Sequence, residues 1–120
     1  MQRHPNVYTD ISFGYVKQMQ AGFDALWNDT ALFRTLVTKY QDRILFATDA
    51  VVGRAPTADA AGIAGVVGAY RDVLEKDRYE PALWPEHRRR GLHLDPGVLR
   101  KIESTNFDSF IARPAGGTAK

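Results

Sequence analysis

Two strand-like segments about thirty residues apart constrain the fold of this chain more than any other feature. Residues 6–12, NVYTDIS, and residues 43–49, RILFATD, are rich in the residue types that favour strands. Between them lies an apolar stripe at helical spacing, which comprises Leu26, Thr30, Phe33, Leu36, Val37 and Tyr40. A strand, a helical crossover and a second strand form a βαβ unit, so we expect the two strands to be parallel.

The later part of the chain predicts two more helices. Residues 28–30 offer a cap for the crossover helix, and Thr57 or Asp59 offers one for a helix that ends near residue 76. Asp95 and Pro96 are typical of a helix start. The closing helix that they open carries Val98, Leu99, Ile102, Asn106 and Phe110.

Two segments are expected to lie outside the helices. Residues 77–94 contain Pro81, Pro85 and Gly91, and their pattern predicts an irregular connection. Residues 113–120, RPAGGTAK, predict a disordered tail. We therefore place a single domain at residues 1–112, because 120 residues are too few for two domains.

Composition narrows the function classes. The net charge of +2 gives no field that would favour nucleic acid, and no apolar run approaches the length that spans a bilayer. Disulfides and thiolate sites are excluded because the sequence has no cysteine. The first residues also lack the apolar core of a signal peptide, so we expect a cytoplasmic protein that binds neither nucleic acid nor membrane.

Two parallel strands do not make a stable sheet by themselves. Such strands are normally buried on both faces within sheets of more strands, and a lone pair leaves both edges open. The pattern therefore predicts an α/β protein that is one part of a larger sheet.

Several motifs together resemble the amidohydrolase-related family of metal-dependent hydrolases. They are, in order, RHPNVYTDIS, DRILFATDA after about thirty residues, YRDVLE, and GLHLDPGVLRKIESTNFDSFI. The resemblance covers nearly the whole chain, and RILFATD is its most specific part. It implies the last two βα units and the C-terminal helices of a (β/α)8 TIM barrel, whose full length is roughly 250 residues.

The resemblance also implies a role for Asp49. In that family, the acid that ends the last strand binds a catalytic divalent metal, zinc or manganese, and accepts a proton from the metal-bound water. Asp49 occupies that position here, at the strand end where such barrels hold their active sites. The residues alone favour the other interpretation of Asp49, a turn aspartate that accepts hydrogen bonds from loop amides.

The family's metal-binding histidines have no counterpart in this sequence. His4 precedes the first strand, which places it roughly 20 Å from the end where Asp49 lies. His87 and His93 have no zinc-binding spacing and are expected to be loop residues. A catalytic zinc usually has three protein ligands, so we expect this chain to bind no metal on its own.

The sequence gives weaker support for a functional role of the other polar and small residues. Ser12 is expected near the same strand end as Asp49, where it either binds substrate or caps the strand. Residues 88–90 are arginines that either contact phosphates or lie solvated in a loop. Gly62, Gly65 and Gly68 predict a thin helix face for close packing rather than a phosphate loop.

Two function hypotheses follow. The first is a truncated or split hydrolase or decarboxylase of small molecules, inactive alone, which needs a complementary chain that bears the missing N-terminal half. The alternative is a non-catalytic helical interaction module that self-associates through its open strand edges and its glycine-rich helix.

Overall fold

The two predicted strands form a parallel pair, β1 (Thr9–Asp10) with β2 (Ile44–Leu45). The backbone N–H of Ile11 extends this ladder by donating to the carbonyl of Leu45 at 3.2 Å. The expectation of a parallel pair in a mixed helix-and-strand fold is therefore confirmed. Only two residues of each predicted strand enter the ladder, so the strands are much shorter than the sequence pattern suggested.

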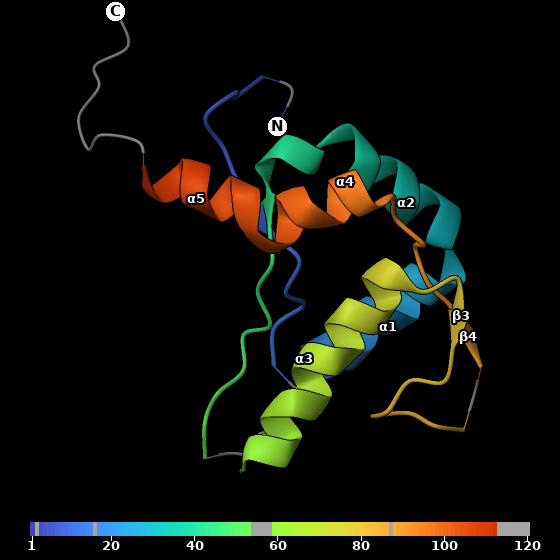
Figure 1. Cartoon of the computed structure of the whole chain (residues 1–120). Helices are drawn as coiled ribbons and strands as arrows, with labels where there is room; N and C mark the ends of the chain where they lie inside the picture. Colours follow the sequence, from blue (N-terminus) through green and yellow to red (C-terminus); the bar gives the residue numbers. More distant parts are fainter. Residues whose placement is uncertain (2, 16, 54–58, 87, 113–120) are drawn as a thin grey trace, which may run out of the picture.

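The computed structural model describes residues 1, 3–15, 17–53, 59–86 and 88–112 (Figure 1). The predicted tail at 113–120 lies outside these residues. The other elements are α1 (Lys17–Asn28), α2 (Thr30–Lys39), the 3-10 turn η1 (Gln41–Arg43), α3 (Ala60–Glu75), β3 (Arg78–Tyr79), β4 (Arg89–Arg90), α4 (Pro96–Arg100), the π-helical segment η2 (Lys101–Thr105) and α5 (Asn106–Ile111).

The crossover between β1 and β2 contains two helices rather than one. Asp29 separates α1 from α2, and its carboxylate accepts a hydrogen bond from the Leu32 N–H at 3.0 Å. This cap lies within the predicted residues 28–30. It divides the predicted apolar stripe between the two helices. Leu26 is buried on α1, whereas Val37 is the buried residue of α2.

Helix α3 begins where the sequence predicted. The Asp59 carboxylate accepts a hydrogen bond from the Gly62 N–H at 2.8 Å and caps the first turn. The alternative cap, Thr57, lies outside the described residues. The buried face of α3 comprises Val66, Ala69, Tyr70, Val73 and Leu74.

An aromatic cluster joins α1 to α3 and to the connection that follows α3. Its members are Phe13, Phe23, Trp27, Tyr70 and Trp84. The Phe23 ring is fully buried, and its centroid lies 5.0–5.4 Å from those of the other four rings. Such tilted and edge-on pairs favour a fixed arrangement of the rings, so this cluster is the best-defined part of the core.

The prediction of an irregular connection at residues 77–94 was wrong in part, because β3 and β4 form an antiparallel hairpin. After the hairpin, the chain bonds to the end of α3: Leu92 N–H donates to the Val73 carbonyl and Leu94 N–H to the Leu74 carbonyl. Gly91 makes this approach possible, because a Cβ there would collide with the Lys76 carbonyl oxygen.

The closing helix contains a π-helical segment that the sequence did not indicate. Pro96 is in the first turn as predicted, although Asp95 makes no side-chain capping bond. Within η2, the Asn106 N–H donates to the Lys101 carbonyl, five residues back. Figure 1 shows α4 and α5 as one nearly continuous orange rod.

This rod covers the outer edge of β2. The Phe46 N–H donates to the Ile102 carbonyl at 2.9 Å, and the Asn106 side-chain amide donates to the Ile44 carbonyl at 2.8 Å. In a parallel ladder, alternate residues point to opposite edges, and Ile44 and Phe46 point away from β1. The expectation that both edges of the strand pair are open was therefore wrong for β2.

Gly65 and Gly68 of α3 do not form the predicted close-packed face. A Cβ on Gly68 would meet open space, and one on Gly65 would make an ordinary contact with Leu83. The close approach occurs on α1 instead, where a Cβ on Gly22 would collide with the Phe13 ring. None of the described helices is long and apolar enough to cross a membrane.

Candidate functional site

The carboxyl ends of β1 and β2 bring together the residues that the sequence singled out. The chain after β2 continues for three residues without regular structure and reaches Asp49, whose side chain is exposed. The segment after β1 passes beside it, because Gly14, Tyr15 and Asp49 line one small hollow. Asp49 thus lies at the end of the strand pair at which the resemblance placed it.

The backbone at Asp49 has an unusual conformation. Its φ angle is 51°, in the left-handed region that few residues other than glycine occupy. Aspartate and asparagine are the non-glycine residues that enter this region most readily. The conformation therefore agrees with a turn aspartate as well as with a site residue, and it leaves both readings open.

The hollow beside Asp49 is too small for a substrate. Its volume is about 10 Å³, which is at most the space of one water molecule. Met19 and Val66 form its apolar wall. The described residues alone therefore do not shape a substrate pocket at this end of the strands.

Ser12 is engaged by its neighbour Asp10. Its backbone N–H and its hydroxyl both donate to the same Asp10 carboxylate oxygen, at 2.9 and 2.7 Å. This arrangement is an Asx-type turn that ends β1. To bind a substrate, the Ser12 hydroxyl would have to give up its bond to Asp10.

Tyr70 of α3 binds the segment that follows β1, which sequence reasoning missed. Its hydroxyl accepts a hydrogen bond from the Phe13 N–H at 2.9 Å, across 57 positions of sequence. Burial raises the pKa of Tyr70, the bond from Phe13 lowers it, and the negative charges of Asp49 and Asp10 raise it further. The only sequence signal was an aromatic residue on the buried face of α3.

The described residues do not fit a catalytic metal ion. No group of three or more histidine or acidic side chains that could hold an ion occurs among them. His4 is exposed beyond the opposite end of β1, and its carbonyl accepts a bond from the Arg43 guanidinium. His93 is exposed with a φ of 44°, and His87 lies outside the described residues.

The arginine cluster is divided between two environments. Arg88 and Arg90 are exposed, whereas the Arg89 guanidinium lies over the Trp27 ring, 4.6 Å from its centroid. Arg89 is therefore used in packing against an aromatic face. The three guanidinium groups do not point to one common surface.

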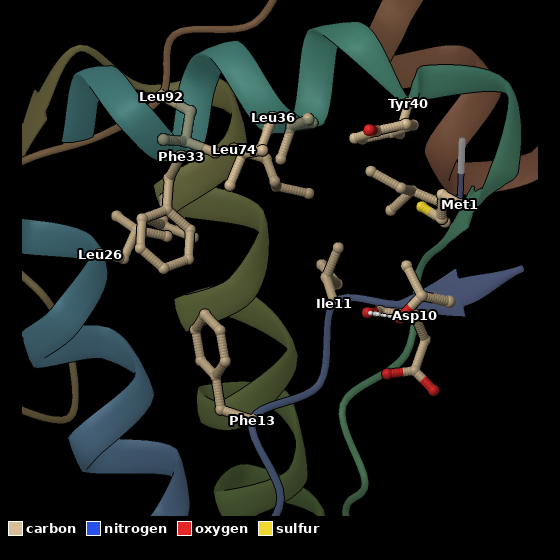
Figure 2. Close-up of a pocket in the computed structure, with 14 residues that line it drawn as sticks. Met1, Asp10, Ile11, Phe13, Leu26, Phe33, Leu36, Tyr40, Leu74 and Leu92 are labelled. Carbon is tan, nitrogen blue, oxygen red and sulfur yellow. Dashed lines mark hydrogen bonds between the residues drawn. The ribbon is translucent and has the colours of Figure 1, made fainter. Parts of the chain in front are cut away.

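A second, much larger hollow lies between the β1–β2 strand pair and α2 (Figure 2). We call it the apolar cavity. Its volume is about 330 Å³. Neither Asp49 nor Ser12 is among the residues that line it, so it is separate from the strand ends described above.

Comparison with known proteins gave no match of this chain to a protein-family model, a curated protein or a solved structure. The family resemblance therefore depends on the sequence motifs alone.

Proposed function

We propose that this chain is the C-terminal portion of an amidohydrolase-related hydrolase or decarboxylase that acts on a small molecule. In this proposal, β1 and β2 are the last two strands of a (β/α)8 TIM barrel, and the C-terminal helices close it. Asp49 supplies one carboxylate to the active site. A complementary chain with the N-terminal strands supplies the rest.

The observation that carries the proposal is the parallel pairing of β1 and β2 with Asp49 after β2. Antiparallel or distant strands would have been incompatible with neighbouring barrel strands. The crossover through α1 and α2 is the type of connection that parallel strands require. Active sites of such barrels lie at the carboxyl ends of the strands, which is the end that Asp49 occupies.

Completion of the barrel requires new pairing at both edges of the strand pair. The outer edge of β1 is the accessible one, because Asp10 points away from β2 and, among the described residues, its carbonyl accepts a hydrogen bond from the Thr9 hydroxyl alone, at 3.2 Å. The outer edge of β2 is covered by Ile102 and Asn106. A complementary chain would therefore pair first with β1 and then displace the C-terminal helix from β2.

The metal of such an enzyme, zinc or manganese, would be held mainly by the complementary chain. Three protein ligands are usual for a catalytic zinc, and Asp49 alone is one. In a titration of the isolated chain with zinc or manganese, we expect no stoichiometric binding. Tight binding that disappears in Asp49→Asn would show that this chain holds the ion unaided, and would overturn this part of the proposal.

The DNA beside the coding sequence provides the decisive test. We expect an upstream or neighbouring segment that encodes histidine-bearing strands. Co-expressed with this chain, its product should retain about one metal ion per complex, and Asp49→Asn should lower that content. Asp24→Asn, an exposed change on α1, is the matched control. Equal metal content in both variants would contradict the role of Asp49.

A second candidate function is self-association without catalysis. Three large apolar side chains of α5 are exposed, namely Phe107 at 53%, Phe110 at 46% and Ile111 at 61%. Clustered exposed apolar residues often mark interfaces. Light scattering over a range of concentrations should then show dimers that Ile111→Glu dissociates and Ser109→Glu, on the same helix, leaves intact. A monomer at every concentration would exclude this function.

A further inference from the structure

The apolar cavity has the dimensions of a ligand site rather than of a packing defect. Protein cores leave few voids larger than a water molecule. This cavity measures about 330 Å³, within the range of small-molecule pockets. It is bounded by α2 on one side and by β1 and β2 on the other, and residues at the end of α3 form its back (Figure 2).

The lining of the cavity carries almost no polar groups. Among the described residues that line it, only Thr9, Asp10 and Tyr40 have side-chain oxygen or nitrogen atoms. The Asp10 carboxylate bonds to Ser12, and Figure 2 shows it pointing away from the ring of apolar side chains. A buried water needs two to four polar partners, so this lining favours an apolar occupant over water.

Positive groups lie beside the cavity. Met1, which carries the α-amino group, is one of the lining residues, and the Lys39 ammonium lies 5.5 Å from the centroid of the Tyr40 ring. The Arg43 guanidinium lies 5.6 Å from the same centroid and donates to the carbonyls of Met1 and His4 at 2.8 and 3.0 Å. The cavity therefore selects its ligand by the apolar side chains that line it and not by charge.

We propose that the cavity binds a small apolar molecule, such as a fused aromatic or a medium-length alkyl chain. An engineered apolar cavity of about 150 Å³ accommodates benzene, so a cavity of roughly twice that volume accepts a ligand with about ten to twelve carbon atoms. Phe33 and Tyr40 on its α2 side offer aromatic faces to such a ligand. The inference is independent of the proposed hydrolase origin, since it uses neither Asp49 nor a metal.

Phenylnaphthylamine, a neutral fluorophore, tests this inference on the full chain. We expect saturable one-to-one binding with increased fluorescence, and a rise in the melting temperature with ligand concentration. Decanol should displace the probe, whereas butanol, which buries far less apolar surface, should compete at least about tenfold less well. The absence of saturable binding would overturn the proposal, and equal competition by the two alcohols would overturn the apolar ligand class.

Two leucines of α2 provide a matched pair of variants. Leu36 lines the cavity and is 42% exposed, whereas Leu32, one turn earlier, is 49% exposed and does not line it. Leu36→Trp fills the cavity and should weaken probe binding at least about tenfold, while Leu32→Trp should leave it unchanged. Leu36→Ala enlarges the cavity and should retain binding. Equal effects of the two tryptophan variants would place the probe elsewhere and overturn the assignment.

Discussion

The aromatic cluster and the apolar cavity are both bounded by large apolar side chains, yet only one of them is filled. In the cluster, Phe23 contacts four rings and is fully buried. In the cavity, comparable side chains surround about 330 Å³ of space. Hydrophobicity alone therefore does not determine packing, and the cause of the difference lies in what holds each region in place.

Polar anchors fix the rings of the cluster. The Tyr70 hydroxyl accepts from the Phe13 N–H, and the Trp27 indole N–H donates to the Tyr79 hydroxyl at 3.1 Å. Burial raises the pKa of Tyr79 to about 12, and the hydrogen bond from Trp27 acts in the opposite direction. On the cavity side, the strands are two residues long, and no third strand from the described part of the chain joins them to bring more side chains inward.

Truncation of one phenylalanine in each region tests this contrast most strongly. Phe23→Ala removes a fully buried ring and should lower the free energy of unfolding by about 3–5 kcal/mol. Phe33→Ala removes a half-buried ring that already borders empty space, so it loses fewer contacts and should cost about 1–2 kcal/mol. Urea unfolding of both variants measures the difference, and equal losses would show that the cavity is packed in solution.

The packing of the C-terminal helix against the edge of β2 should depend on one polar side chain. Asn106 is 5% exposed, and its amide donates to the carbonyls of Gln41 and Ile44. Asn106→Ala leaves both carbonyls without this donor and should cost about 2–3 kcal/mol. It should also increase amide hydrogen exchange at Phe46, because the edge of β2 loses its cover. Ser109→Ala, an exposed change on the same helix, should alter stability by less than about 0.5 kcal/mol.

A loss at Asn106 no larger than that at Ser109 would mean that the closing helix does not hold the β2 edge. The proposed order of barrel completion, first at β1 and then at β2, would then lose its basis.

A pair of glycine substitutions gives effects of opposite sign. Gly22→Ala places a methyl group against the Phe13 ring, and the overpacking should outweigh the gain in helix propensity, for a net loss of about 1–2 kcal/mol. Gly68→Ala points into open space and should gain up to about 1 kcal/mol. Thermal melts at one pH compare the two. Stabilisation by both changes would show that Phe13 moves freely and that the cluster is less rigid than its geometry indicates.

The sequence predicted features that depend on local chemistry. The caps at Asp29 and Asp59, the helix start at Pro96 and the parallel strand pair each follow from residue types at short range.

Features that depend on distant partners were missed. The β3–β4 hairpin pairs Arg78 with Arg90 and Tyr79 with Arg89, and it lacks the alternation of apolar and polar residues that marks a strand. The spacing of the α3 glycines could not show that open space lies opposite Gly68. The link from Phe13 to Tyr70 spans 57 positions, and an empty cavity has no residues of its own to leave a signal.

Substitution of Asp49 has the smallest expected effect on stability. It also distinguishes a functional Asp49 from an Asp49 that only holds the turn. Its side chain is exposed, and its left-handed φ of 51° suits asparagine as well as aspartate. If its role is functional, Asp49→Asn should change the free energy of unfolding by less than about 0.5 kcal/mol, since neither the cluster nor the cavity depends on its charge. If Asp49 is a turn residue whose carboxylate holds the loop, the same change should cost about 1 kcal/mol or more. Urea unfolding of Asp49→Asn beside Asp24→Asn separates the two, and a loss confined to Asp49 would assign it to the turn and remove the main support for a hydrolase origin.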